Sequence, residues 1–396
     1  MSFNKREVVI VSGVRTPIGT YGGALKGVSP VDLASQCIRE AVSRASIEPK
    51  MVEHSIFGNV LQTEPRDAYL SRCAAIKGGL SEYSAAMNVN RLCGSGLQAV
   101  VSASQLIQLG EARCVVAGGA ESMSRVPYAL PAMRWGARMG ETKALDSVTE
   151  CLQDPFGHGH MGCTAENLAQ KYKITREDQD ELALESHRRA ANAWDKKFFD
   201  EQVTAIEISS RRAVKRISQD NHFRDNISID ELSKLRTVFQ QDGTVTASNS
   251  SGINDAAAAL ILMDREVAEN QGVKPLARIV GYSYAGVDPR FMGIGPVPAI
   301  KSLMQNTGLS IDDMDVIELN EAFAAQVLAV ITELNLPREI TNTNGSGISL
   351  GHPIGATGAI IMIKALYELI RTKGKYGLVS MCIGGGQGSA AIIEAL

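Results

Sequence analysis

Residues 8–45 read VVIVSGVRTPIGTYGGALKGVSPVDLASQCIREAVSRA. The apolar run 8–13 predicts a buried strand, a segment rich in turn residues follows it, and 31–45 has the spacing of a helix. The same rhythm continues along the chain, with further apolar runs at 55–61, 114–120, 277–283, 315–323 and 376–382. Strands that alternate with helices predict an α/β protein with mainly parallel sheets.

Length and composition limit the kind of protein. A chain of 396 residues exceeds what one hydrophobic core usually accommodates, so we expect two or more domains. Apolar residues make up 44% and charged residues 21%, which is typical of a soluble globular protein. A formal net charge of −3 and only 5% aromatic residues exclude a nucleic-acid reader built on basic and stacking surfaces.

The sequence contains no sign of a membrane or secreted protein. We find no apolar stretch of about 18 residues, and the first residues lack the pattern of a signal peptide. None of the seven cysteines forms a C-x-x-C pair, which disfavours a disulfide framework and a zinc ribbon. We therefore expect a cytoplasmic protein with free thiols and no membrane partner.

The strand–helix rhythm repeats at long range. Asn59 and Asn320 each end an apolar strand and lie 261 positions apart (320 − 59). Cys93 in LCGSG and His352 in GHPIG lie 259 positions apart (352 − 93), and each has a glycine three residues later. Two offsets this similar predict two homologous halves of one architecture.

Cys93 stands before two glycines at the start of a predicted helix. Gly94 and Gly96 permit a sharp turn and a close approach of the backbone. At a helix N-terminus, unpaired N–H groups and the helix dipole would stabilise a thiolate and could bind an oxyanion. A buried cysteine that only fills space is the alternative. His352, at the matching turn of the other half, favours the nucleophile, because a cysteine–histidine pair is the expected arrangement for activating a thiol.

Two further segments carry polar groups to strand ends. Asn320 and Glu321 follow an apolar strand, where α/β sheets place functional groups, although a turn-capping asparagine is the ordinary alternative. Cys382 ends a strand in MCIGGGQG, and a strand-like run follows the glycines, so we reject a dinucleotide fingerprint there. HGHMG (158–162) has no third ligand nearby, and we expect no metal site.

The segment 123–250 differs in character from both halves. Thr175 and Asp178 have the spacing of a capping box before a helix, and 208–226 is basic and poorly periodic. We predict that this segment is a helical insertion on the first half. The domain boundaries are then 1–122 with 251–274 for the first half, 123–250 for the insertion and 275–396 for the second half.

Taken together, the motifs resemble those of the thiolases along nearly the whole chain. The matching segments are VSGVRTPIG, NRLCGSGLQA, GGAESMS, HMGCTAEN, GTVTASNSSGINDAAAA, MGIGPVPA, NEAFAA, NGSGISLGHPIGATG and CIGGGQG. FGNVLQTEPRDAYL and RWGARMG are most similar to bacterial β-ketothiolases of broad chain-length range, which are near relatives of acetoacetyl-CoA thiolases. The resemblance implies a five-layered αβαβα fold.

The resemblance also implies roles for individual residues. Cys93 would be acylated by an acyl-CoA, with His352 taking its proton, and Cys382 would deprotonate the second substrate. Asn320 would hold a water at one oxyanion site, and the N–H groups of Cys93 and Gly384 would form the other. Acetyl-CoA and CoA would be substrates, with no permanently bound cofactor.

The same resemblance predicts substrate contacts and assembly. Residues implied at the CoA and acyl groups are Ser251, Arg224, Leu152, His160, Met161 and Phe323. The stretch 127–140 resembles a loop that pairs dimers, which predicts a homotetramer, with a dimer as the alternative. A ketoacyl synthase and a non-catalytic acyl-CoA-binding or lipid-transfer protein are rival interpretations. The first typically has two histidines beside its cysteine, and the second would be expected to lack one of the four catalytic side chains.

Overall fold

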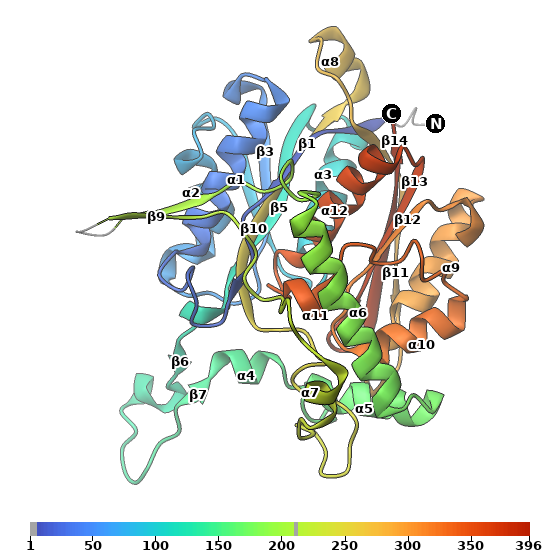
Figure 1. The fold of residues 1–396 in the computed structure, drawn as a ribbon. Helices are drawn as coiled ribbons and strands as arrows, with labels where there is room; N and C mark the ends of the chain where they lie inside the picture. Colours follow the sequence, from blue (N-terminus) through green and yellow to red (C-terminus); the bar gives the residue numbers. More distant parts are fainter. Residues whose placement is uncertain (1–5, 210–212) are drawn as a thin grey trace.

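The computed structural model describes residues 6–209 and 213–396, so part of the basic stretch 208–226 lies outside the described residues. Ten strands form one sheet with the order β12-β13-β14-β11-β1-β10-β5-β3-β4, and β2 pairs with β10 (Figure 1). These strands are β1 (Val8–Arg15), β2 (Gly19–Thr20), β3 (His54–Gly58), β4 (Ala85–Val89), β5 (Cys114–Ser122), β10 (Asn254–Asp264), β11 (Ala277–Gly286), β12 (Val316–Leu319), β13 (Tyr376–Ile383) and β14 (Gln387–Ala395).

Helices cover both faces of this sheet, and four short strands form two separate ribbons. The helices are α1 (Pro30–Ala45), α2 (Leu70–Lys77), α3 (Ser95–Leu109), α4 (Ser147–Cys151), α5 (Met161–Tyr172), α6 (Arg176–Asp195), α7 (Ile229–Ser233), α8 (Arg265–Asn270), α9 (Pro296–Thr307), α10 (Ala324–Leu334), α11 (Gly347–Leu350) and α12 (Thr357–Thr372). The ribbons are β6 (Tyr128–Ala129) with β7 (Leu145–Asp146), and β8 (Ile206–Ser209) with β9 (Val214–Ile217).

The sheet repeats one strand order in its two halves. Counted outward from the centre, the first half runs β1-β10-β5-β3-β4 and the second half runs β11-β14-β13-β12. At the centre, β1 and β11 pair over only two residue pairs, Val9 with Arg278 and Ile10 with Ala277. The register also shifts at matching places, between Ile10 and Ser12 against β10, and between Ile279 and Gly281 against β14. The repeated strand order agrees with the prediction of two similar halves.

The expectation of mainly parallel sheets is wrong. Only the pairs β3–β4, β3–β5 and β12–β13 are parallel, and the pairs that involve β1, β10, β11 and β14 are antiparallel. The physical reason is connectivity. β13 turns directly into β14 through the glycine-rich segment 384–386, and the long segment after β5 returns the chain as an antiparallel β10. The direct turn from β13 to β14 leaves no room for the crossover that parallel neighbours require, whereas the long segment after β5, which contains several helices, allows either direction.

Alternation along the strands shows how the layers form. Val8 and Ile10 of β1 belong to the central core, whereas Val9 and Val11 belong to the core on the other face, beneath α1 and α2. The second half repeats this division, because Ala391 and Ile393 of β14 face the central core, whereas Ala390 and Ile392 pack beneath α9 and α10. Successive strand residues point to opposite faces, so each half-sheet is covered on both sides. The result is five layers, αβαβα.

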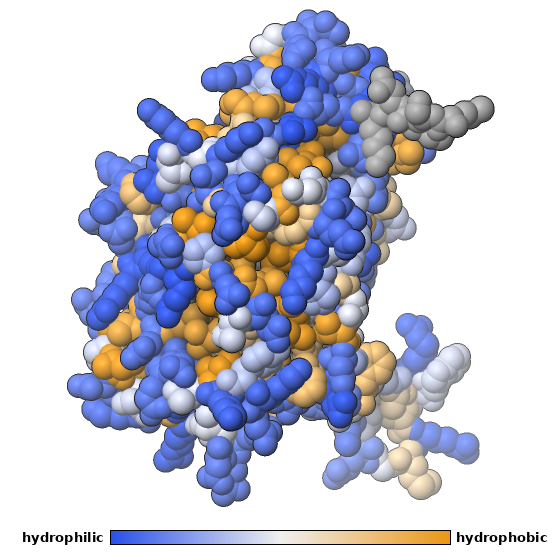
Figure 2. Space-filling model, turned by 90° about the vertical axis from the view of Figure 1, so that its right-hand side faces the viewer, coloured by the Kyte–Doolittle hydropathy of each residue, from blue (hydrophilic) through white to orange (hydrophobic). Residues whose placement is uncertain are grey.

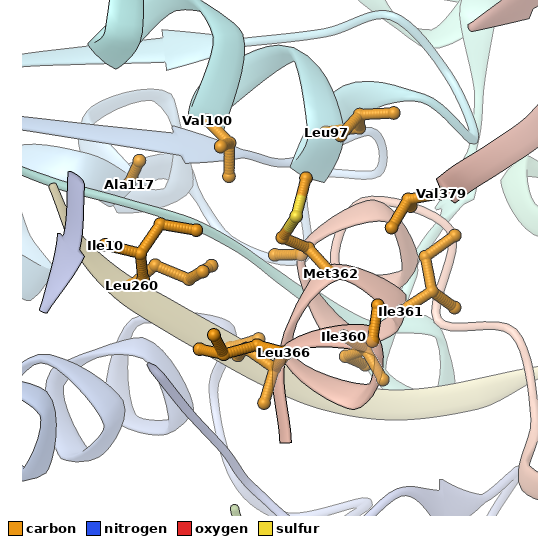
Figure 3. Close-up of a cluster of buried hydrophobic side chains, with 14 of the residues drawn as sticks. Ile10, Leu97, Val100, Ala117, Leu260, Ile360, Ile361, Met362, Leu366 and Val379 are labelled. Atoms are coloured by element: carbon orange, nitrogen blue, oxygen red, sulfur yellow. The ribbon is translucent and has the colours of Figure 1, made fainter. Parts of the chain in front are cut away.

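The middle layer consists of α3 and α12, which pack against each other and are shared by both half-sheets. Figure 3 shows Leu97 and Val100 of α3 opposite Met362 of α12, with Leu260 of β10 and Val379 of β13 from the two halves in the same cluster. The starts of the two helices are in close contact, because a Cβ on Gly96 would lie 2.8 Å from Ala359 N and a Cβ on Gly358 would lie still closer to Leu97 N. They therefore meet near the seam between the two halves.

The segment between β5 and β10 contains α4–α7 and both ribbons, and it extends below and beside the layered body in Figure 1. The capping box predicted for its longest helix is confirmed: Asp178 N donates to Thr175 Oγ1 at 3.1 Å, and Thr175 N donates to Asp178 Oδ2 at 2.9 Å. A fully buried ion pair anchors this segment to β1, with Arg15 Nη1 2.7 Å from Asp220 Oδ1.

The outer face on the side of α9 and α10 is shown in Figure 2. Hydrophilic residues cover most of this face, and hydrophobic residues gather near its middle. Among the helices formed by residues 6–209 and 213–396, none is long and apolar enough to cross a membrane.

Candidate active site

A cavity of ≈ 340 Å³ lies where the starts of α3 and α12 approach the insertion. Its walls are largely apolar, and they come from both halves of the chain and from the segment between β5 and β10. The lining residues are Cys93, Met123, Leu152, His160, Met161, Val238, Phe239, Ala247, Ser250, Ser251, Gly252, Ile253, Met292, Ala322, Phe323, His352, Ile354, Cys382 and Gly384. An apolar cavity with a few convergent polar groups is typical of a small-molecule site.

Cys93 precedes α3, which begins two residues later at Ser95 with Gly94 as its N-cap. The glycines are required by close approach: a Cβ on Gly94 would lie 2.6 Å from Ile383 Cδ1, and a Cβ on Gly96 would lie 2.8 Å from Ala359 N. The expected tight turn is therefore confirmed, and its tightness brings Cys93 against the second half.

Burial raises the pKa of the Cys93 thiol to about 11, while hydrogen bonds from the N–H groups of Gly384 and of Cys93 itself oppose this rise. At neutral pH the group is therefore a thiol, and a nearby base must take its proton before it can act as a nucleophile. Two backbone N–H groups converge on the sulfur.

His352 is held in one orientation and one tautomer. Its backbone N–H donates to Asn254 Oδ1 at 2.9 Å, and its Nδ1 lies 2.7 Å from Thr357 Oγ1. The Thr357 hydroxyl also lies 3.0 Å from the Pro353 carbonyl, which can only accept, and we assign its hydrogen to that bond, so that Nδ1 is the donor in the contact with Thr357. Nε2 is then left without a hydrogen. Burial lowers the pKa of His352 to about 4, so the ring is neutral at pH 7 and can accept a proton at Nε2.

Helix α12 begins at Thr357, four residues after Pro353. Pro353 lies in the turn, where its carbonyl accepts from the N–H groups of Ala356 and Thr357. This turn separates His352 from the helix and directs the imidazole toward the cavity.

Asn320 and Cys382 complete the polar part of the site. Asn320 follows β12 and is fully buried; its Nδ2 lies 3.5 Å from His352 Nε2, and its Oδ1 has no hydrogen-bond partner in the described structure. A buried amide oxygen without a partner is uncommon, so this atom is available to a bound molecule. Cys382 lies on β13, and burial raises the pKa of its thiol, with a smaller contribution from the nearby Cys93.

Aromatic rings form one wall of the cavity. His160 stacks on Phe239 with ring centroids 4.7 Å apart, and Phe239 meets Phe323 edge to face at 6.1 Å. His160 also caps α5, because its Nδ1 accepts from Gly162 N at 3.0 Å. Across residues 6–209 and 213–396, no group of three or more His, Cys, Asp or Glu side chains is arranged to hold a metal ion.

Most of the predicted site residues lie together. Cys93, His352, Cys382 and Gly384 line the cavity, and so do the predicted contact residues Leu152, His160, Met161, Ser251 and Phe323. Asn320 lies directly behind His352. Arg224 is the exception, because it lines a separate depression with Asn226, Ile227, Glu231, Leu232 and Leu235.

Sequence reasoning missed several residues that matter to the site. Met123, Phe239, Met292 and Ile354 line the cavity, and Thr357 orients His352. Only Thr357 had a usable signal, since a hydroxyl five residues after a histidine at a helix start can reach its ring. A larger open groove of ≈ 750 Å³ between α1 and β8 contains none of the predicted residues, and charged side chains of both signs line it.

Comparisons with known proteins identify the family of this chain. The model of the thiolase N-terminal domain matches residues 8–266, and that of the thiolase C-terminal domain matches residues 273–395. The chain is 56% identical to the beta-ketothiolase BktB of Cupriavidus necator, over 99% of this chain and 100% of that protein. It is 46% identical to the acetyl-CoA acetyltransferase of Escherichia coli K12, again over 99% and 100%.

Solved structures show the same architecture. The acetyl-CoA acetyltransferase of Bacillus anthracis superposes with a TM-score of 0.98 at 49% identity, with 100% of both chains covered. Human mitochondrial 3-ketoacyl-CoA thiolase in complex with CoA gives a TM-score of 0.96 at 43% identity, with 99% of this chain and 98% of that chain covered. The chain therefore belongs to the thiolase family, and its fold is the five-layered thiolase fold.

Proposed function

We propose that the protein catalyses reversible acyl transfer between CoA thioesters by way of an acyl group on Cys93. It condenses acetyl-CoA with a second acyl-CoA, and in the opposite direction it cleaves a 3-ketoacyl-CoA with CoA. Its family makes it an acyl-CoA C-acyltransferase, as the names of its relatives indicate. The observation that carries the mechanism is a single apolar cavity lined by two thiols, Cys93 and Cys382, and by the imidazole of His352.

In the first step Cys93 attacks the thioester carbonyl. A bond forms between Cys93 Sγ and the acyl carbon, the bond to the CoA sulfur breaks, and CoA leaves. His352 Nε2 takes the proton of the thiol and passes it to the departing CoA sulfur. The contact between Nδ1 and Thr357 supports this role, because it keeps the lone pair on Nε2. The N–H groups of Cys93 and Gly384 stabilise the tetrahedral oxyanion.

In the second step Cys382 passes its proton to His352, and the Cys382 thiolate removes a proton from the methyl group of a second acetyl-CoA. The resulting carbanion attacks the acyl carbon on Cys93, a carbon–carbon bond forms, and the sulfur of Cys93 is released with its electron pair and takes the proton from His352. Before that transfer, the protonated Nε2 of His352 and a water held by Asn320 donate hydrogen bonds to the enolate oxygen. In the cleavage direction the carbon–carbon bond breaks, the released carbanion takes the proton of Cys382, and the Cys382 thiolate then deprotonates CoA, whose sulfur attacks the acyl-enzyme.

The cavity walls support CoA thioesters as substrates. Leu152, Met161 and Phe323 offer apolar contacts for the acyl and pantetheine chains, and Ser251 and His160 supply polar atoms among them. A relative solved in complex with CoA has this fold. Arg224 lies outside the cavity, where we propose that it meets the phosphates of CoA. No permanently bound cofactor is part of this mechanism.

We also propose a homotetramer, with a dimer as the alternative, in the cytoplasm. The stretch 127–140 includes β6 and lies on the arm that projects from the body in Figure 1, and Trp135 and Met139 in it are 86% and 94% exposed. Large apolar side chains exposed together are typical of an interaction surface. The domain division at residues 122, 250 and 274 remains our prediction, and the repeated strand order supports it.

The test is a series of kcat/KM values for cleavage of 3-ketoacyl-CoA substrates of increasing chain length, with mass spectrometry of the acyl-enzyme. We expect turnover of at least one substrate and a trapped acetyl group on the peptide that contains Cys93. Cys93→Ser should abolish turnover, whereas Cys73→Ser, at a partly buried cysteine of α2 outside the cavity, should not. Absence of turnover with every chain length would overturn the proposal.

A further inference from the structure

The polar groups that the second half contributes to the site have counterparts in the first half, and the strand registers identify these counterparts. Gly58 of β3 pairs with Gly119 of β5, and Leu319 of β12 pairs with Ser380 of β13. Asn59 directly follows Gly58, and Asn320 directly follows Leu319. Glu121 lies two residues after Gly119 in the first half, and Cys382 lies two residues after Ser380 in the second half.

Glu121 therefore occupies the position that Cys382 occupies in the other half, but its environment is different. It is fully buried and does not line the cavity. Its Oε1 accepts from Asn59 Nδ2 and Leu61 N, both at 3.1 Å, and its Oε2 accepts from Val60 N at 3.1 Å and Gly355 N at 2.9 Å. All four partners are donors, so a proton on either oxygen would find no acceptor among them, and the contacts favour the carboxylate.

The fourth contact crosses from one half of the chain to the other. Gly355 belongs to the turn between His352 and α12, and this turn is pressed against the strand ends of the first half. A Cβ on Gly355 would lie 2.5 Å from Glu121 Oε2, and a Cβ on Gly58 would lie 2.6 Å from Gly355 O. Such close approach means that the carboxylate and the turn cannot move independently. The position of the imidazole relative to Cys93 thus depends on a hydrogen bond that Glu121 accepts.

The charge of Glu121 also acts on the nucleophile. A carboxylate at this place raises the pKa of the Cys93 thiol, in addition to the larger effect of burial. Burial raises the pKa of Glu121 to about 8, with a smaller rise from the charge of Asp67, and the backbone N–H groups that it accepts from oppose this rise. Because this value lies below the pKa of about 11 for Cys93, Glu121 is ionised over the pH range in which the Cys93 thiol loses its proton. Burial also raises the pKa of Cys151, with smaller contributions from Cys93 and Glu121.

We propose that Glu121, together with Asn59, is a positioning pair that fixes the His352 turn of the second half against the Cys93 turn of the first half. The pair stands where the other half carries Asn320 and Cys382, and it binds protein backbone in place of substrate. This inference rests on the roles proposed above for Cys93 and His352. It explains why a duplicated scaffold has a single site: the equivalent polar groups of the first half are occupied in joining the halves.

Glu121→Gln tests the proposal, with Asp67→Asn as the matched control. The Asp67 carboxylate is also buried and also accepts from backbone, from Thr63 N at 2.7 Å and Glu64 N at 3.2 Å, but it does not contact Gly355. Three quantities are measured for each protein: kcat and KM for cleavage of acetoacetyl-CoA, the pH midpoint for alkylation of Cys93 by iodoacetamide, and the melting temperature.

In Glu121→Gln an amide NH2 replaces one oxygen and faces two N–H donors, so two of the four hydrogen bonds are lost whichever way the amide lies. We expect kcat to fall about 10- to 100-fold, the usual effect of displacing a reacting group by about 1 Å, with KM within about twofold. The alkylation midpoint should move to lower pH, because a negative charge near Cys93 is removed. Asp67→Asn should lower the melting temperature while leaving kcat and the midpoint unchanged.

A kcat within about twofold of the wild type, with an unchanged midpoint, would overturn the inference, as would an equal loss of kcat in Asp67→Asn. If Glu121→Gln does not fold, Asn59→Ala replaces it. That variant keeps the carboxylate and removes one donor, and a kcat equal to that of the wild type would then overturn the inference. Wild-type turnover tests the proposed function separately, and the alkylation midpoint reports on Glu121 even if no turnover is found.

Discussion

Replacing Thr357 by valine tests how His352 is made a base. The change keeps the shape of the side chain and removes the oxygen that accepts from His352 Nδ1 at 2.7 Å. The ring then has a buried N–H without a partner, which costs about 1–3 kcal/mol, unless the hydrogen moves to Nε2. Either outcome disfavours the tautomer that accepts a proton at Nε2. Since 1.36 kcal/mol corresponds to a factor of ten, we expect kcat/KM to fall about 5- to 150-fold.

The assay follows the loss of enolate absorbance when acetoacetyl-CoA is cleaved by CoA. Thr357→Ser is the matched control, because it retains the hydroxyl and should retain most of the activity. Thr357→Val with turnover close to that of the wild type would refute the tautomer argument. Equal losses in the valine and serine variants would also refute it, since the methyl group and not the hydroxyl would then be responsible.

Three further predictions concern the site, the buried ion pair and pH. Asn320→Ala should slow condensation by about 3 kcal/mol of barrier with an unchanged circular dichroism spectrum, because it removes one oxyanion group; near-normal turnover contradicts this. Asp220→Asn leaves Arg15 buried without its charge partner, and urea denaturation should show a loss of about 3–5 kcal/mol in the free energy of unfolding. Burial lowers the pKa values of His352, His187 and His222 to about 4, below the ordinary 6.5, so these groups make the fold less stable as pH falls from 6.5 to 4, whereas Glu121 and Glu318, with pKa values raised to about 8 and 7, act in the opposite direction. Melting temperatures of the wild type and His187→Gln over this pH range isolate one histidine: the wild type should lose more stability toward pH 4, and parallel profiles would contradict the assignment.

Sequence reasoning identified the turns that carry the site, because short motifs with glycines define them locally. Cys93, His352 and Cys382 each follow or end an apolar run, and the two-half repeat was visible in the spacing of Cys93 and His352. The directions of the strands were not visible in the same way. An alternating pattern is the same for parallel and antiparallel neighbours, so the long return from β5 to β10 and the tight turn from β13 to β14 had to be seen in the structure.

Contacts between distant segments were the second feature that the sequence could not predict. Glu121 meets Gly355 across 234 positions, and no local pattern in either segment indicates the other. Phe239 joins the cavity wall from a stretch with little periodicity, and a basic composition could not determine which way Arg224 faces. Local sequence determines which groups occupy a turn, whereas tertiary packing determines which turns meet.

The two halves share few backbone hydrogen bonds, since β1 and β11 pair over only two residue pairs, and the association depends mainly on the packing of α3 against α12. Hybrid enzymes that join the first half of one thiolase to the second half of another take α3 from one parent and α12 from the other, so they should fold only where the contact surfaces of these two helices match. Mismatched helices would leave each half folded around an incomplete interior. Recombination within this family is then limited by the interface between α3 and α12. Catalysis also depends on how well these helices pack, because Cys93 and His352 lie at their starts.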